Sequence, residues 1–127
     1  MARNFLMVIA TILAFFGLFY VFSPQTLAEQ AGLSATPSGL TDIRATYGGF
    51  QMGFAVFLFW SCRSPVNIGN ALVATGVIFG CVGLGRLFGV IVDGEFSGFN
   101  MIGLTFEVIL TTACLVLNRN HQKSASQ

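Results

Sequence analysis

Apolar residues gather in four long stretches, and polar residues, glycine and proline concentrate between them. The stretches cover about residues 5–22, 43–62, 68–92 and 99–117. Each is close to the ~20 residues that an α-helix needs to cross the ~30 Å hydrocarbon core of a bilayer. The pattern therefore predicts an all-α fold, a four-transmembrane-helix bundle that occupies residues 1–127 as a single membrane domain.

The first stretch follows Arg3, as the apolar core of a secretory signal peptide would. It is longer than the roughly 7 to 15 residues of such a core, so we expect a retained span. The connection over residues 23–41 contains Pro24, Gly32, Pro37 and Gly39 and is too long for a tight turn. Two interpretations stay open: a plain tether, or a short interfacial helix near residues 26–31.

Composition supports the membrane class, because 54% of the residues are hydrophobic and only 9% are charged, whereas soluble domains have about 25% charged residues. The formal net charge is +1 and no basic run occurs, so nucleic acid is not an expected partner. Cys62, Cys81 and Cys114 lack the paired spacing of a disulfide or metal site, and His121 lies in a polar tail. We therefore predict no metal and no cofactor.

Charged residues at the predicted helix ends are sorted by sign. The basic ones lie at one set of ends and are Arg3, Arg63, Arg119 and Lys123. The acidic ones lie at the other set and are Glu29, Asp42, Asp93 and Glu95. Basic residues are enriched on the cytoplasmic side of membranes, so we predict that the N- and C-termini are both cytoplasmic.

Two predicted helices carry a narrow stripe of polar or small residues at spacings of three and four. The stripe of the second helix contains Arg44, Tyr47, Gly48, Gln51, Ala55, Leu58 and Cys62. The stripe of the fourth contains Asn100, Gly103, Glu107, Thr111, Cys114 and Asn118. Both should turn away from lipid. Glycines expected to allow close helix packing, within the bundle or between protomers, are Gly49, Gly53, Gly76, Gly80, Gly83, Gly85 and Gly89.

Arg86 and Glu107 are charged residues that lie deep within the apolar stretches. A charge in hydrocarbon costs roughly 2.5 to 3.5 kcal/mol, so an opposite pair there predicts a functional site. Counting from the outward helix ends places both residues and Gln51 about 10 Å inside. Three interpretations stay open: a neutralised structural pair completed by Gln51, a pocket that binds a polar ligand, or side chains that reach the interface separately.

In the pocket interpretation, Arg86 is the donor that faces an anion, and Glu107 is its counter-charge. Gln51 and Tyr47 orient the ligand, and Asp93, on the same helix face as Arg86, holds the guanidinium. The remaining ligand-binding candidates line a funnel to the outer surface and are Asp42, Arg44 and Asn100. A guanidinium suits carboxylate or phosphate, so the predicted ligand is lipid-like or a small anion.

Two local patterns point to a family. A D-x-R-x-x-Y-G-G run opens the second helix with Asp42, Arg44, Tyr47, Gly48 and Gly49. A G-x-x-R-x-x-G-x-x-x-D-G run closes the third helix with Gly83, Arg86, Gly89, Asp93 and Gly94, and Glu107 follows in the fourth. The chain resembles a family of small bacterial four-helix integral membrane proteins that is classed as a domain of unknown function. The resemblance implies the fold and an inner-membrane location, and it carries no established activity.

The favoured function is a multi-pass membrane protein whose outward-facing polar pocket binds or moves a lipid-like or small anionic ligand, with membrane lipid as its partner. The alternative is an accessory or assembly subunit of a membrane complex, or a homo-oligomeric structural membrane protein. An enzyme is not favoured, because the sequence shows no nucleophile–base pair, no histidine in a span, no metal-ligand spacing and no nucleotide-binding loop.

Overall fold

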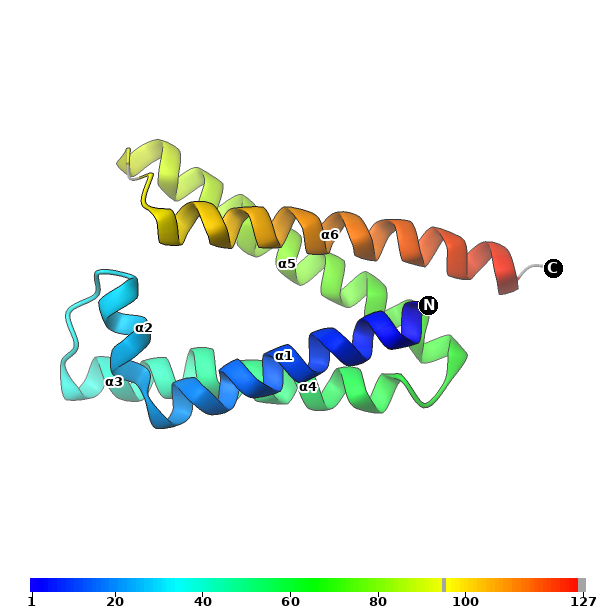
Figure 1. Cartoon of the computed structure of the whole chain (residues 1–127), viewed down its shortest axis with the longest axis horizontal. Coiled ribbons are helices and arrows are strands. Elements are labelled where there is room, and N and C mark those ends of the chain that lie inside the picture. The colour runs from blue at the N-terminus through cyan, green and yellow to red at the C-terminus, as the bar shows by residue number, and fades with distance from the viewer. Residues whose placement is uncertain (95, 126–127) are drawn as a thin grey trace. The chain divides into compact units, whose positions relative to one another are not determined.

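The computed structural model describes residues 1–94 and 96–125, and the regular structure in this part of the chain is entirely helical. Along the chain the helices are α1 (Ala2–Phe22), α2 (Pro24–Gln30), α3 (Pro37–Ile43), η1 (Arg44–Gly49), α4 (Phe50–Ser61), α5 (Pro65–Asp93) and α6 (Gly98–Ala125) (Figure 1). The predicted all-α class is confirmed. Glu95, which the charge pattern assigned to an acidic turn, lies outside the described residues.

Three of the described helices, α1, α5 and α6, are long and apolar enough to cross a membrane. The second predicted span is wrong as a single helix, because the chain there consists of α3, a π-helical segment η1 and α4. A π-helical turn is wider than an α-helical turn and usually inserts one residue. Here it coincides with Gly48, whose backbone is pressed against α1, so a tertiary contact rather than local sequence accounts for the break.

The chain forms two compact units, which are described separately. The N-terminal unit runs from Arg3 to Arg63, and the C-terminal unit contains Met1, Ala2 and the chain from Ser64 onward. The expected single four-helix domain over residues 1–127 stays a prediction.

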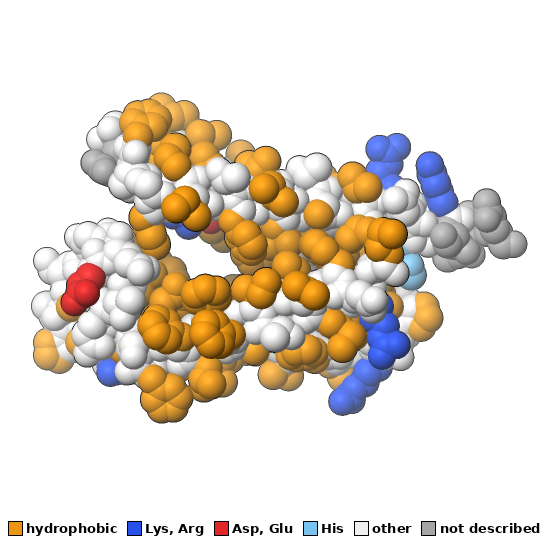
Figure 2. Space-filling view, in the orientation of Figure 1, with side chains coloured by type: hydrophobic (Ala, Val, Ile, Leu, Met, Phe, Trp, Pro, Cys, Tyr) orange, Lys and Arg blue, Asp and Glu red, His pale blue; other side chains and the backbone are white. Residues whose placement is uncertain are grey.

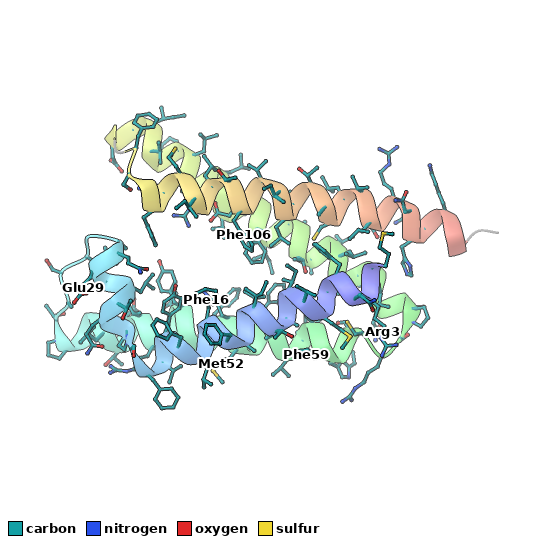
Figure 3. All side chains as sticks on the ribbon, viewed as in Figure 1. Arg3, Phe16, Glu29, Met52, Phe59 and Phe106 are labelled. Carbon is teal, nitrogen blue, oxygen red and sulfur yellow. The ribbon has the colours of Figure 1, made fainter. Side chains whose placement is uncertain are left out.

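In the N-terminal unit, α1 packs antiparallel to the helical segment formed by η1 and α4 (Figure 1). The contact needs two glycines. A Cβ atom on Gly17 would lie 2.9 Å from the Gly48 carbonyl oxygen and from the backbone nitrogen of Met52, a residue labelled in Figure 3. A Cβ atom on Gly48 would lie 2.6 Å from Cγ2 of Val21. Only the missing side chains therefore allow the helices to approach this closely.

Two short helices join α1 to η1. Pro24 opens α2, and Gly32, with a φ of 67°, ends it in a Schellman motif in which the Leu33 N–H donates to the Ala28 carbonyl at 2.8 Å. The hydroxyl oxygen of Thr36 accepts a hydrogen bond from the Gly39 N–H at 3.1 Å and caps α3. The long connection therefore contains a short helix where the second of the two open interpretations expected one, and its position at a membrane interface stays a prediction.

The C-terminal unit is an antiparallel hairpin of α5 and α6 (Figure 1). Glycines of α5 face side chains of α6: Cβ atoms on Gly76, Gly80 and Gly83 would lie 3.3 to 3.5 Å from Cys114, Thr111 and Glu107. These three glycines therefore mediate close packing, as predicted for helix-packing glycines. A Cβ atom on Gly85 or Gly53 would meet nothing within 4 Å, so those two glycines do not mediate packing inside their own units.

The polar tail of the chain is part of a helix, because α6 continues to Ala125. His121 lies on this extension and donates from Nε2 to the Pro65 carbonyl at 2.9 Å, which ties the end of α6 to the start of α5. The polar tail is thus helical through the described residues, and side chains on it such as Arg119 and Gln122 are exposed.

Most charged residues at the helix ends are sorted by sign in each unit, and Arg44, which bonds the Val21 carbonyl at the acidic end of the N-terminal unit, is an exception. Arg3 and the labelled Glu29 lie at opposite ends of the N-terminal unit (Figure 3). In the C-terminal unit, Arg119 and Lys123 lie on the last turns of α6, and Asp93 lies at the other end of the hairpin. Hydrophobic side chains cover much of the visible face of both units (Figure 2), as a lipid-facing surface requires.

We expect Gly48→Ala to lower the free energy of unfolding by about 1 to 3 kcal/mol, because the new methyl group overlaps Val21. The measurement is reversible unfolding in detergent micelles followed by circular dichroism. Gly53→Ala is the matched control, since its methyl group meets open space, and it should be neutral or slightly stabilising. Equal stability of the two variants would contradict the proposed contact.

Candidate functional site

Arg86 of α5 and Glu107 of α6 form a bidentate ion pair. Arg86 donates from Nε to both carboxylate oxygens of Glu107 at 3.0 and 3.1 Å, and from Nη2 to Oε1 at 2.8 Å. Glu107 is buried, with 4% of its surface exposed, whereas the Arg86 side chain is 25% exposed. The pair therefore compensates a buried carboxylate while one side of the guanidinium stays accessible.

Glycines shape the place where the guanidinium lies. A Cβ atom on Gly103 would lie 2.8 Å from Cζ of Arg86, so the guanidinium rests directly on the α6 backbone. Gly83 leaves the corresponding space beside the Glu107 side chain, where a Cβ atom would approach Cβ of Glu107 to 3.3 Å. Gly103 was not among the predicted site residues, although its position four residues before Glu107 places it on the same helix face.

The first turns of α6 complete the surroundings of Arg86. Asn100 accepts a hydrogen bond at its Oδ1 from Nη1 of Arg86 at 3.3 Å. The Phe99 ring centroid lies 5.9 Å from Cζ of Arg86, within the range of a cation–π contact. The guanidinium is thus held by a carboxylate, an amide and an aromatic ring, all from α6.

A groove opens beside this network, and we call it the polar groove. It has a volume of about 470 Å³ and is lined by Val82, Arg86, Gly89, Val90, Asp93 and Asn100. The α5 residues of this set recur at spacings of three and four, so they form one face of the helix. The polar groove therefore follows the last three turns of α5 and reaches the start of α6.

Asp93 does not hold Arg86 in the way the sequence suggested. The described residues contain one ion pair of Arg86, with Glu107, and no hydrogen bond between Arg86 and Asp93. Oδ2 of Asp93 lies 3.9 Å from the Cβ position of Gly89, so the carboxylate bends back along α5 toward the polar groove. The Glu107 carboxylate is the more deeply buried of the two acids, and its desolvation explains why it takes the cation.

The other predicted site residues belong to the N-terminal unit. Arg44 donates from Nε to the Val21 carbonyl at 3.1 Å and thereby caps the end of α1. Tyr47 and Asp42 are exposed. Oε1 of Gln51 is buried and has no hydrogen-bond partner among the described residues. A ligand role for these four residues stays a prediction, and the structure gives Arg44 a structural role that the sequence did not indicate.

A second, mostly apolar groove of about 320 Å³ lies on the same hairpin and includes Glu107, Phe79 and Leu104 in its lining. The rings of Phe79 and of Phe106, which is labelled in Figure 3, meet edge to face with centroids 6.1 Å apart.

Among the described residues, no group of three histidine, cysteine or acidic side chains is placed to bind a metal ion.

The chain belongs to the family described as a domain of unknown function (DUF4345), whose model matches residues 1–118. The family resemblance found in the sequence is thereby confirmed. No curated protein and no solved structure matches the chain.

The Arg86–Glu107 pair makes a prediction for a double-mutant cycle. We expect Arg86→Gln to lower the free energy of unfolding by about 3 kcal/mol, because it leaves the buried Glu107 carboxylate without its partner. Glu107→Gln should lower it less, because the Arg86 side chain that it leaves unpaired is 25% exposed. The double variant removes both charges and should lose less than the sum, with a coupling of about 1 to 3 kcal/mol. Unfolding in detergent micelles measures all three variants. Strictly additive losses would show that the two side chains do not stabilise one another.

Proposed function

We propose that the protein is a multi-pass protein of the bacterial inner membrane that binds a membrane lipid, and that the polar groove holds the lipid headgroup. The observation that carries this proposal is the partial use of Arg86. A guanidinium has five N–H donors. Glu107 accepts hydrogen bonds from Nε and Nη2 of Arg86, and Asn100 accepts one from Nη1. The side chain is anchored, and it still has donors for a phosphate in the groove.

Location favours a lipid over a soluble ligand. The polar groove begins where α5 ends and α6 begins, which in a spanning hairpin is the depth of the headgroups, and it extends about 10 Å inward to Arg86. A lipid is present there at high local concentration, with its acyl chains beside the exposed apolar side chains of the helices. A small free anion would have to reach a groove whose arginine is already neutralised by Glu107, and Asp93 would repel it.

The charge distribution supports an orientation for this proposal. Apart from Arg44, the basic residues at the helix ends lie near one end of each unit, which favours cytoplasmic termini and an outward-facing polar groove. The alternative, an accessory subunit or homo-oligomer, relies on the exposed apolar faces. The lipid of a bilayer covers such faces as well as a partner protein does, so the exposed apolar faces do not favour that alternative.

Filling the polar groove tests the proposal. Val82 is exposed and lines the groove, so Val82→Trp should block the headgroup without removing either member of the Arg86–Glu107 pair. We expect the occupancy of lipid adducts in native mass spectra of the full chain to fall about tenfold, the change that one lost charge-assisted hydrogen bond produces.

Val77→Trp is the control, because Val77 is an exposed residue of α5 that lines neither groove described above. It should retain the adducts of the wild type. If both tryptophan variants keep the same adducts, the lipid does not bind in the polar groove and the proposal fails.

A further inference from the structure

We infer that the headgroup in the polar groove is zwitterionic, with its phosphate toward Arg86 and a primary ammonium toward Asp93, as in an aminophospholipid of the phosphatidylethanolamine class. This inference rests on the proposed function and specifies its ligand. It follows from the distribution of charge along the groove, which has one positive and one negative end.

Asp93 forms the negative end. It is the last residue of α5, where the helix dipole and the free carbonyl groups already carry partial negative charge. An acidic side chain at this position is unfavourable by itself, and no basic side chain pairs with it among the described residues. Its carboxylate is exposed and bends back over Gly89 toward the groove. Carboxylate and helix terminus together attract a cation.

Arg86 forms the positive end. Its guanidinium is fixed by Glu107 and Asn100 and is partly exposed to the groove. The N–H donors of Arg86 that Glu107 and Asn100 leave unused can therefore bind a phosphate oxygen at this end.

The total charge of the groove argues against an anionic lipid. Arg86 and Glu107 cancel, which leaves the Asp93 carboxylate as the uncompensated charge of the lining. A headgroup with one phosphate and one ammonium brings no net charge and matches both ends. The groove volume of about 470 Å³ is many times the ~30 Å³ that a water molecule occupies in the liquid, so such a headgroup has room.

Hydrogen bonding distinguishes a primary ammonium from a trimethylated one. An –NH₃⁺ group has three donors and can bind the Asp93 carboxylate directly. A choline group has no N–H donor and only attracts the carboxylate at a greater distance. We therefore expect ethanolamine headgroups to bind more tightly than choline headgroups, and both to bind more tightly than anionic glycerol headgroups.

The test is competition between lipids on the full chain in detergent, measured by native mass spectrometry. The wild type receives equal amounts of phosphatidylethanolamine and phosphatidylglycerol with identical acyl chains. We expect about tenfold preference for the ethanolamine lipid, and Asp93→Asn should remove that preference. The variant should fold, because it removes a negative charge from a helix C-terminus.

Glu29→Gln is the matched control. It removes the same charge from an exposed acid on α2, outside the polar groove, and should keep the wild-type preference. If the preference survives in Asp93→Asn, or is lost equally in Glu29→Gln, Asp93 does not recognise the ammonium and the inference is overturned.

The outcomes also separate this inference from the proposed function. If the wild type binds both lipids equally and Val82→Trp weakens both, the groove binds lipid and only the zwitterionic headgroup is ruled out. If Val82→Trp weakens neither lipid, the groove does not bind lipid at all, and both proposals fail together.

Discussion

One buried carboxylate governs the structure of the C-terminal unit. Glu107 is 4% exposed on a helix that is otherwise apolar enough to cross a membrane, so its charge must be compensated from within the protein. Arg86 compensates it with a bidentate contact, which fixes the rotation of both helices as well as their separation. The glycines of α5 allow that separation to be short. The register of the hairpin follows from this pair, and the register brings Asn100 to the guanidinium.

The same pair changes what the groove can bind. An arginine beside a cavity usually suggests an anion site, but here its charge is already matched by Glu107. Arg86 still has N–H donors for a ligand, but the ion pair that it forms with Glu107 has no net charge. The one uncompensated charge of the groove lining is negative and lies at Asp93. Arg86 alone would suggest that the groove prefers an anion. Because Glu107 already pairs with Arg86, the charge that remains in the lining is that of Asp93, and the groove prefers a cation at that end.

That Arg86 and Glu107 lie at the same level of the hairpin could be predicted from the sequence, because helix rise is constant and both residues lie seven positions from a polar helix end. Which of two acids, Glu107 or Asp93, pairs with Arg86 could not be predicted. Asp93 shares a helix face with Arg86, whereas Glu107 lies on another helix, and spacing alone favoured both. Burial decides between them, since the carboxylate removed from water needs the cation more. Burial depends on the packing of α5 against α6, which a single sequence does not reveal.

Helical segments were predictable where the apolar run alone defines them, and less so where tertiary contacts intervene. The π-helical segment η1 has no local signal that we recognised; it occurs where Gly48 meets α1. Arg44 was predicted as a site residue because it belongs to the polar stripe of the second predicted helix and to the predicted funnel. The structure uses it to cap the Val21 carbonyl, a role that depends on where α1 ends.

These observations separate Asp93 from the charges that hold the fold together. Arg86, Glu107 and Arg44 each satisfy a group inside their own unit, so their removal would disturb the structure. Asp93 satisfies no such group among the described residues, and its position at the end of α5 is electrostatically unfavourable. A charge that the helix disfavours is stabilised once a cation binds to it. The favourable contact that Asp93 lacks within its unit is thus available from a ligand, and the polar groove is where that ligand has room.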